Sequence, residues 1–463
     1  MSKKTAVGQH QDIPEVPDAS RRLASAWLLL GIAALAIAGL FAILLVLARA
    51  PGLGALFPTQ DFFRTALVVH VDQSVLIWFL AFAGALWSLD ACAPSGITPA
   101  RATAFALAAA GCLVIAAAPF LGAGDPLLNN YVPVLQHPLF HTGLGLFAAG
   151  VVLQALLALR ATTTAPRAWL ERPVDLAVLS AALATLAAIV ALAWTWLSLG
   201  RWEGLAYFEF LFWGGGHVVQ FAYTQLMLVA WLLLAGALGV SLGAPQRVLG
   251  ALVLLGILPL LAVPLIYAQH PVDTAETRLA FTRLMQWGNG LAAIPVGVLV
   301  AVGLLRHRIA PTLDQKPLRR ALATSLLLFA VGGLIGGAIS GLNTIIPAHY
   351  HGSIVGVTLA LMGLTYHLLP RLRLGTPPPR LAALQPVIYA TGQLLHVGGL
   401  AASGAMGIQR KTAGAAQGLD SLGAKAAMGV MGLGGLLAVI GGILFVVAVI
   451  MAVRGRDRTR AAA

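Results

Sequence analysis

Twelve apolar runs of 20 or more residues dominate this sequence, and short stretches rich in Pro, Gly or charge separate them. About 20 apolar residues in a helix cross a bilayer, because each residue rises ~1.5 Å and the hydrocarbon core is ~30 Å thick. The runs predict an all-α integral membrane protein, a single bundle of twelve transmembrane helices. The predicted spans are residues 24–48, 65–89, 102–122, 136–159, 176–199, 206–240, 248–270, 280–305, 321–343, 348–369, 382–404 and 426–453.

The composition also predicts a lipid environment. Only 10% of the residues are charged and 59% are hydrophobic, whereas a soluble domain is typically about 25% charged. The formal net charge is +13, but the basic residues lie in short tracts between the apolar runs, so the sequence predicts a lipid bilayer and no nucleic acid as partner. Cys92 and Cys112 form no motif for a disulfide framework or a Cys-based metal site.

The distribution of Lys and Arg predicts the orientation of the bundle. If the N-terminus is cytoplasmic, 21 of the 29 Lys and Arg residues fall on the cytoplasmic side, as the positive-inside rule requires. We therefore expect both termini in the cytoplasm and a multi-pass protein of a bacterial-type inner (plasma) membrane. Residues 1–23 form a polar N-terminal segment without the apolar core of a signal peptide. Residues 24–453 form the membrane domain, and residues 454–463 form a basic cytoplasmic tail.

Eight of the eleven histidines fall in the outer part of the predicted spans or at their outer ends. Polar groups inside a membrane are costly and tend to mark functional sites. Imidazole is also a common ligand of haem iron, copper and non-haem iron. A metal-binding layer therefore explains this arrangement better than separate interhelical hydrogen bonds do. The eight are His70, His137, His141, His217, His270, His349, His351 and His396.

The sequence His349-Tyr350-His351 places two of these histidines two residues apart in one predicted helix. Such residues point about 200° apart, so their rings cannot bind the same metal. They can bind two haems that lie on opposite sides of the helix. The alternative for this pair is two unrelated histidines at helix interfaces.

Three sequence segments that contain histidines are similar to segments of a known family. ALVVHVDQSVLIWFLAFAGALW contains His70, FWGGGHVVQF contains His217, and AHYHGSIVGVTLALMGLTYHLLPRL contains the His-x-His pair. With these segments, and over essentially its whole length, the chain resembles subunit I of the haem-copper oxidase superfamily, which includes oxygen reductases and nitric oxide reductases. The resemblance implies the twelve-helix fold of cytochrome oxidase subunit I, with metal sites towards the outer face.

The resemblance also implies ligands for two haems of the b type and for one non-haem metal, Cu or Fe. His70 and His351 would be the axial ligands of a low-spin haem, and His349 the proximal ligand of a high-spin haem. His217 and His270, the latter in IYAQHPVD, would hold the second metal.

Arg410 and Lys411, in the loop GAMGIQRKTAG, resemble the paired basic residues that meet haem propionates in the family. The alternative for these two is a solvated loop. The resemblance implies no role for His137, His141 or His396, which could meet haem propionates, hydrogen-bond to the metal ligands, or line a quinol site.

The chain departs from the family pattern at the second metal. Where the family has two adjacent histidines, this sequence has Gln269-His270, so a third ligand remains open. Glu209, Gln220, Gln269 or another histidine of the layer could fill this place, and loss of metal affinity is the alternative. Glu209 lies roughly two turns before His217 and Gln220 one turn after it. We expect Glu209 and Gln220 to join the two histidines as catalytic residues, and interhelical hydrogen bonds are the alternative for both.

A second departure concerns the active-site tyrosine of the oxygen reductases. Phe221 occupies the family's usual position, four residues after His217, and Val263 occupies the alternative position before Gln269. Tyr223 and Tyr267 lie nearby but out of register.

The resemblance implies the catalytic subunit of a respiratory terminal reductase, an oxidoreductase that takes electrons from a cytochrome c-type subunit or a quinol. Electrons would pass through the low-spin haem to a binuclear centre that reduces O2 or NO. The missing tyrosine favours reduction of NO to N2O, because that reaction needs only two electrons and no O–O cleavage. The alternatives are a cytochrome c or quinol oxidase that reduces O2 to water, and a haem-binding subunit that has lost the second metal. A transporter would require polar sites at the midplane, which the histidine layer does not match.

Overall fold

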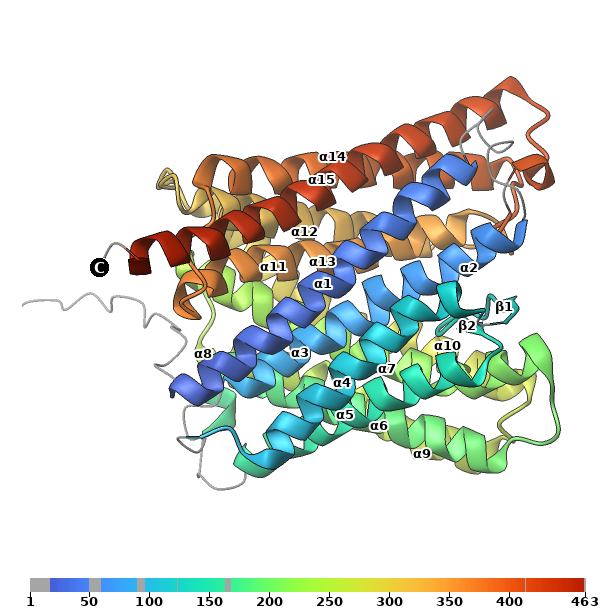
Figure 1. Ribbon diagram of the computed structural model, residues 1–463, viewed down its shortest axis with the longest axis horizontal. Helices are drawn as coiled ribbons and strands as arrows, with labels where there is room; N and C mark the ends of the chain where they lie inside the picture. The colour runs from blue at the N-terminus through green and yellow to red at the C-terminus, as the bar shows by residue number, and fades with distance from the viewer. Residues whose placement is uncertain are drawn as a thin grey trace, which may run out of the picture.

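Long helices run side by side and form a single bundle (Figure 1). The computed structural model describes residues 17–49, 60–89, 96–122, 124–162, 168–412 and 414–461. In this described part, eleven helical spans are long and apolar enough to cross a membrane. A twelfth long helix, α14 (Pro379–Ala405, 27 residues), packs along α15 (Leu422–Ala461). The predicted all-α membrane bundle of twelve helices is therefore confirmed.

The remaining helices follow the predicted spans closely, and four spans of the described part consist of more than one helical segment. Residues 1–16 of the predicted N-terminal segment lie outside the described ranges. In chain order the elements are α1 (Asp18–Arg49), α2 (Gln60–Val71), η2 (Asp72–Ile77), α3 (Trp78–Ser88), α4 (Pro99–Ala117), η3 (Ala118–Leu121), β1 (Pro126–Leu127), β2 (Val134–Leu135), α5 (Pro138–Thr162), η4 (Trp169–Glu171), α6 (Pro173–Ser198), α7 (Gly204–Ala237), α8 (Gln246–Leu255), η5 (Leu258–Ala262), α9 (Val263–Gln269), α10 (Ala275–Gly288), α11 (Gly290–Arg306), α12 (Lys316–Gly336), α13 (Ile345–Arg371), α14, η6 (Gly414–Gln417) and α15.

Local sequence explains most of the irregular points. Pro259 and Pro264 divide the seventh span into α8, η5 and α9, because proline lacks the N–H that an α-helix needs in its interior. The ninth span ends at Gly336, seven residues before its predicted end at 343, where Gly337 follows and helix propensity is low. A π-helical segment, η2, directly follows α2 in the second span, and hydropathy does not predict it.

Small residues allow neighbouring helices to approach closely. A Cβ atom on Gly332 of α12 would lie 2.2 Å from the backbone N of Ser353 in α13. A Cβ atom on Gly392 of α14 would likewise lie 2.3 Å from the backbone N of Ala438 in α15. Helix association in a membrane relies on such close packing, because lipid removes the hydrophobic drive between helices.

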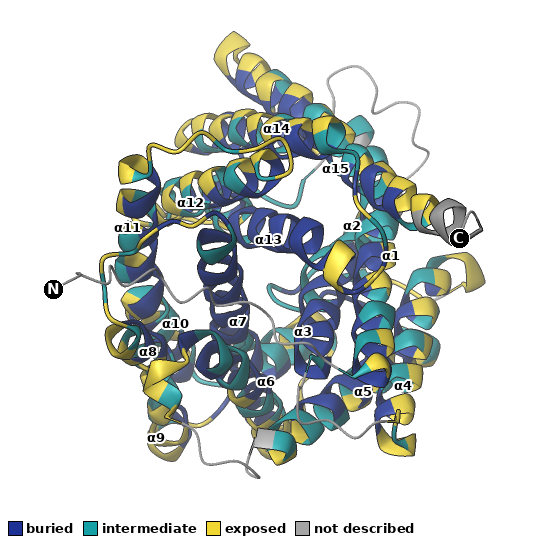
Figure 2. Cartoon of the chain, turned by 90° about the vertical axis from the view of Figure 1, so that its left-hand side faces the viewer, coloured by how far each residue is buried: buried dark blue, intermediate teal, exposed yellow. Residues whose placement is uncertain are grey.

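Two helices form the centre of the bundle, α7 and α13. In each of them 89% of the most apolar 18-residue window is buried, against 67% or less in every other candidate span of the described part. Figure 2 shows both as predominantly buried, with exposed residues concentrated on the surrounding helices. Most side chains in these windows of α7 and α13 therefore face protein and not lipid.

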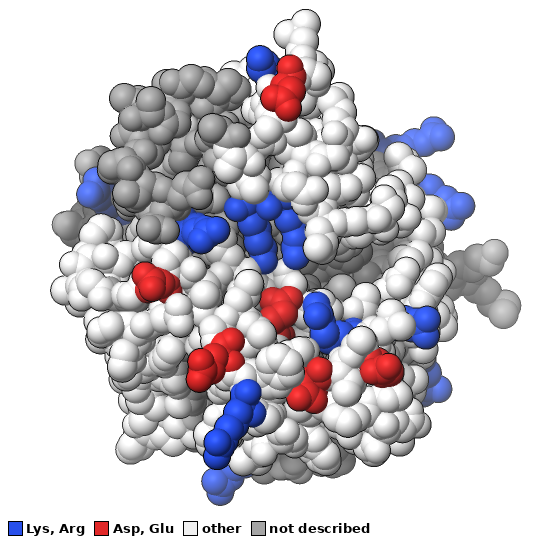
Figure 3. Space-filling view, turned by 90° about the vertical axis from the view of Figure 1, so that its right-hand side faces the viewer, with Lys and Arg blue, Asp and Glu red and all other residues white. Residues whose placement is uncertain are grey.

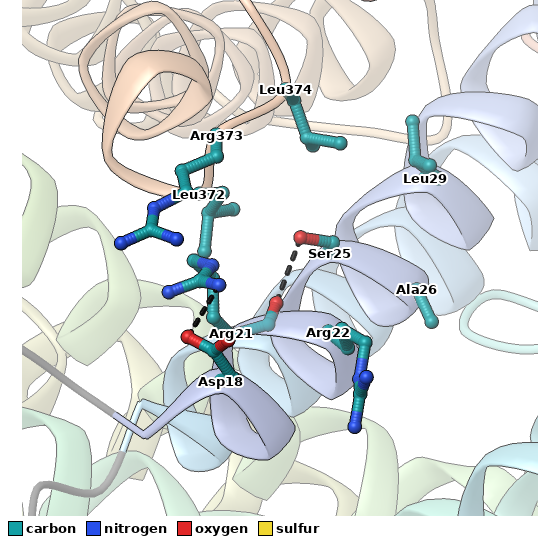
Figure 4. A pocket seen from close by; sticks show the side chains of 9 residues that line it. All are labelled: Asp18, Arg21, Arg22, Ser25, Ala26, Leu29, Leu372, Arg373 and Leu374. Atoms are coloured by element: carbon teal, nitrogen blue, oxygen red, sulfur yellow. Dashed lines mark hydrogen bonds and ion pairs between the residues drawn. The ribbon is translucent and has the colours of Figure 1, made fainter. Parts of the chain in front are cut away.

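The two ends of the bundle differ. The start of α1 and the end of α15 lie together at one end, which we call the tail end, and the short antiparallel β1–β2 hairpin lies at the other, the hairpin end (Figure 1). A pocket of about 490 Å³ opens at the tail end between the start of α1 and the turn after α13 (Figure 4). Its charged lining consists of Asp18, which pairs with Arg21 at 2.6 Å, together with Arg22 and Arg373.

Candidate functional site

Three histidines of the predicted outer layer share one mode of attachment. The ring Nδ1 atoms of His70, His349 and His396 each lie 2.8 to 3.0 Å from a backbone carbonyl oxygen of a neighbouring helix. A carbonyl oxygen can only accept, so Nδ1 carries the proton and Nε2 keeps its lone pair. Histidines that bind metals are held in this way, with the second nitrogen bonded to a carbonyl or carboxylate. For His70 and His349, Nε2 has no hydrogen-bond partner among the described residues.

The two histidines of the His-x-His pair face different neighbours, as their spacing predicts. His349 points towards α12, where its Nδ1 contacts the carbonyl oxygen of Gly332 at 2.8 Å. A Cβ atom on Gly336 would lie 2.7 Å from that nitrogen, so glycine is needed there. His351 instead lies against His396 of α14, with ring centroids 4.8 Å apart in a T-shaped arrangement. The pair therefore presents two imidazoles on separate sides of α13.

His217, in the buried middle of α7, has both ring nitrogens engaged. Its Nδ1 lies 2.7 Å from the carbonyl oxygen of Trp213, one turn earlier in the helix. Its Nε2 lies 2.8 Å from the hydroxyl oxygen of Tyr131. Because the carbonyl fixes the proton on Nδ1, Nε2 is an acceptor and the Tyr131 hydroxyl donates to it. His217 therefore differs from His70 and His349, whose Nε2 atoms remain open.

Tyr131 comes from the hairpin loop, which we define as residues 124–137 between η3 and α5. The tyrosine ring lies against Trp213 and His217, with centroid distances of 5.7 and 4.7 Å. It fits there because residue 216 is glycine: a Cβ atom on Gly216 would lie 2.2 Å from the Tyr131 Cγ. Burial, and next the charge of Glu209, raise the pKa of the Tyr131 phenol, so it stays protonated at neutral pH.

A polar network holds the hairpin loop on the bundle. The carboxylate of Glu209 accepts hydrogen bonds from the backbone N–H of Asn130, at 3.0 Å, and from the Asn130 side-chain amide. The guanidinium of Arg278 in α10 lies 3.9 Å from the same carboxylate and 4.3 Å from the centre of the Trp213 ring. Glu209 is thus a fixed structural partner of the loop and lies beside the Tyr131–His217 contact.

Arg410 and Lys411, in the loop between α14 and α15, reach the same place. Arg410 donates to the side-chain oxygen of Asn130 at 2.8 Å, and Lys411 donates to that oxygen at 3.2 Å and to the carbonyl of Leu128. Burial, with a smaller contribution from Arg410, lowers the pKa of Lys411 to about 8, although Glu209 opposes the shift. Acidic and basic side chains are interspersed on this face of the molecule (Figure 3). The predicted propionate partners are therefore not free loop residues.

Among the described residues, neither Gln269 nor His270 makes a hydrogen bond or ring contact with His217. Gln269 is exposed, and the His270 ring makes no hydrogen bond or ring contact with another described residue. A Cβ atom on Gly214 would lie 2.1 Å from the Tyr267 hydroxyl oxygen, so α9 packs closely against α7 at this point.

Three comparisons place this arrangement among known proteins. A solved haem-copper terminal oxidase dimer shares the fold with a TM-score of 0.71 at 17% identity, over 94% of this chain and 84% of the other. A protein of Rickettsia prowazekii is 30% identical over 92% of this chain and 94% of its own length, and one of Aquifex aeolicus is 32% identical over 75% and 84%. Both relatives are uncharacterized. The family model for cytochrome c and quinol oxidase polypeptide I matches residues 22–444.

The chain belongs to the cytochrome c and quinol oxidase polypeptide I family. It is therefore an oxidoreductase and a multi-pass membrane protein. Haem-copper oxidases generally bind haems and a Cu or Fe ion, so the residues present can be tested for their fit to each group.

The residues fit haem. His70 and His349 present open Nε2 atoms from carbonyl-anchored rings, and His351 lies on the opposite side of α13 from His349. A histidine is the usual axial ligand of haem iron in electron-transfer and gas-binding proteins.

The residues do not fit a second metal at His217. Such an ion needs lone pairs about 2.0–2.2 Å away from several ligands at once. The one lone pair of the His217 ring accepts from Tyr131, and the described part of the chain contains no group of three His, Cys, Asp or Glu side chains placed to hold an ion.

Sequence reasoning missed Tyr131, Asn130 and Arg278. Asn130 and Tyr131 lie in the hairpin loop, and Arg278 lies in the first turn of α10. None of the three is in a motif with the histidines. The polar triplet Asn129-Asn130-Tyr131 in an otherwise apolar connection was the available signal.

Proposed function

We propose that this chain is the catalytic subunit of a respiratory terminal reductase that reduces NO to N2O. His70 and His351 would hold the low-spin haem and His349 the high-spin haem. Bound there, haem would supply electron transfer at the first site and reduction of a small gas at the second. A cytochrome c-type subunit or a quinol would donate the electrons, and the subunit would lie in a bacterial-type inner membrane.

The main support for this proposal is the way in which His349 is anchored. Its ring is fixed through Nδ1 to α12 and offers a single open nitrogen. A ligand that binds from one side only leaves the opposite axial position for a gas, which reactivity requires. The low-spin site, with a histidine on each side, has no such opening and would only carry electrons.

Electron count favours NO over O2. Two NO molecules, two electrons and two protons give one N2O and one water, and two haem irons can supply two electrons together. Reduction of O2 to water needs four electrons. Phe221, completely buried beside His217, and Val263, also buried, provide no phenol at the positions where oxygen reductases of the family carry their tyrosine.

The hairpin end offers the protons that NO reduction consumes. Glu209 is partly exposed, with 16% of its side chain accessible. It bonds to Asn130, and Asn130 precedes Tyr131 in the loop. These residues form a polar connection from the surface to His217, so proton uptake from this face requires no path through the apolar half of the bundle.

One observation favours a second candidate, reduction of O2 to water. Tyr131 places a phenol 2.8 Å from His217, although it comes from a loop and not from α7 or α9. If this phenol replaces the missing tyrosine, an oxygen reductase would need it as a donor.

Anaerobic turnover separates the two candidates. Purified protein with both haems, an artificial electron donor and NO should produce N2O with a ratio of one N2O to two NO. O2 consumption under the same donor should be much slower. Respiratory-rate conversion of O2 to water, with no N2O from NO, would overturn the proposal in favour of the second candidate.

A further inference from the structure

The pocket at the tail end combines positive charge with an apolar wall. It has a volume of about 490 Å³ and lies between the start of α1 and the turn that follows α13 (Figure 4). We propose that this pocket binds an anionic phospholipid, with the phosphate diester on its arginines and the acyl chain against its leucines. The site is separate from the proposed function, because binding there needs neither haem nor turnover.

The charge of the pocket is unbalanced. Among the described residues that line it, Asp18 alone is acidic, and Asp18 pairs with Arg21 at 2.6 Å. Figure 4 shows the Arg373 guanidinium on the Arg21 side of the pocket, whereas Arg22 points away from it. The guanidinium groups of Arg373 and Arg22 form no hydrogen bond or ion pair with another described residue. An anion is therefore missing beside Arg373, and a phosphate suits a guanidinium because its oxygens accept two parallel hydrogen bonds.

Arg373 occupies a backbone position at which glycine is usual. The N–H of Arg373 donates to the carbonyl oxygen of Pro370 at 3.0 Å. The N–H of Leu374 donates to the carbonyl oxygen of Leu369 at 2.8 Å. These two bonds close the end of α13, and residue 373 between them has a φ of +56°, the left-handed conformation that favours glycine. A side chain here costs conformational free energy that glycine would avoid, and it adds a guanidinium to the pocket.

The face of α1 that lines the pocket changes from charged to apolar. Arg21, Ser25 and Leu29 are spaced four residues apart, so they lie one above the other on this face. Arg21 precedes the predicted membrane span, which begins at residue 24, and Leu29 lies inside it with 37% of its surface exposed. Over the ~12 Å between the two residues, the face passes from a guanidinium through a hydroxyl to a hydrocarbon side chain. A phospholipid changes in the same order, from its phosphate through the glycerol esters to the acyl chains.

The apolar wall favours a lipid over a soluble anion. Leu372 and Leu374 contribute to this wall from the turn after α13. A free phosphate would contact only the arginines and would leave Leu29 exposed, whereas an acyl chain would cover it. Basic pockets between transmembrane helices are typical sites for the head groups of anionic lipids.

Thermal unfolding of the purified full chain in detergent tests the site. The protein is measured with added phosphatidylglycerol, with phosphatidylcholine and with inorganic phosphate. We expect phosphatidylglycerol to raise the unfolding temperature of the parent protein more than the other two do, since a ligand stabilises the state that binds it. Native mass spectrometry should show phosphatidylglycerol retained on the chain in preference to phosphatidylcholine.

Two variants remove the arginines of the pocket. Arg373→Gly gives the turn its usual residue, so without added lipid it should be at least as stable as the parent. Its affinity for phosphatidylglycerol should fall about 10-fold or more, as the loss of a charge-assisted hydrogen bond predicts. Arg21→Gln should weaken binding in the same way. Arg380→Gln removes an exposed arginine at the start of α14, outside the pocket, and is the matched control that should bind like the parent.

Several outcomes would overturn the proposal. Equal stabilisation by inorganic phosphate would make the occupant a soluble anion, and equal stabilisation by phosphatidylcholine would remove the role of the arginines. Unchanged affinity for phosphatidylglycerol in both Arg373→Gly and Arg21→Gln would show that the lipid binds elsewhere. An equal loss in Arg380→Gln would show a general effect of surface charge and no built site.

Discussion

The histidines of α13 and of α7 lie in the two most buried helices, yet the protein uses them differently. His349 is anchored by one nitrogen to a backbone carbonyl of α12 and leaves the other nitrogen open. His217 is anchored by one nitrogen to a carbonyl of its own helix, and a tyrosine takes the other. The first arrangement is prepared for an external ligand, and the second is complete without one.

The contrast between His349 and His217 shows that the position of a histidine in a helix does not establish its role. A histidine in either helix keeps an open ring nitrogen unless a group from elsewhere in the sequence, such as Tyr131 of the hairpin loop, bonds to it. Next to His349, Gly336 of α12 leaves space for the imidazole and makes no hydrogen bond to it. Next to His217, the Tyr131 ring from the hairpin loop fills the space that Gly216 leaves.

Of the changes considered, replacing His349 by Ala should have the largest effect on haem binding and turnover. The variant removes the open nitrogen, so the high-spin haem spectrum should be lost and NO or O2 turnover should fall to background, while the low-spin spectrum persists. Optical spectra and steady-state turnover measure both. His141→Ala, an exposed histidine near the hairpin end, is the control. Retention of a high-spin haem in His349→Ala would break the distinction between α13 and α7.

Replacing Gly216 by Ala should have an intermediate effect, confined to the α7 side. The added Cβ atom collides with the Tyr131 ring, and overpacking of this kind costs about 1–3 kcal/mol. Gly236→Ala in the same helix is the matched control, because nothing lies within 4 Å of its new Cβ atom. That control should be neutral or stabilising by up to ~1 kcal/mol.

Thermal unfolding in detergent measures the difference between the two alanine variants. Hydrogen exchange of the hairpin loop should be faster in Gly216→Ala only. Equal unfolding temperatures for both variants would show that the Tyr131 ring does not need the space that Gly216 leaves.

The smallest expected effect concerns Lys411, which helps to hold the hairpin loop. Its pKa is lowered from 10.5 to about 8 in the folded protein, with burial as the main cause. Between these values the folded chain has released a proton that the unfolded chain still binds, so this group makes folding more favourable as pH rises through that window. Below about pH 8 the contribution is constant, because both states are protonated.

The measurement is the unfolding temperature at a series of pH values, for the parent protein and for Lys411→Met. The parent should gain stability relative to the variant from about pH 8 upward. Parallel curves for the two proteins would show that Lys411 is not buried against Asn130 and Leu128.

The sequence predicted the spans well because each one is a local feature. A run such as Leu23–Ala48 specifies a helix wherever it lies in the bundle, and spacing alone was enough to separate His349 from His351. The end of α12 at Gly336 and the π-helical segment after His70 were not predicted, because both depend on local backbone conformation, which a hydropathy pattern does not predict.

The candidate site was predicted only in part, for a different reason. The helical histidines belong to recognisable segments, but their partners come from elsewhere. Tyr131 is 86 residues from His217 in sequence, and Arg410 is 280 residues from Asn130. Contacts of that kind arise from tertiary packing of loops, for which the sequence pattern holds no periodic signal.

The haem content of the purified chain shows whether α13 holds two haems through rings on its opposite sides. We expect two haems per chain, one low-spin and one high-spin, and loss of the low-spin spectrum alone in His351→Ala. Protein that is colourless despite an adequate haem supply, or a His351→Ala variant that keeps both spectra, would contradict the account.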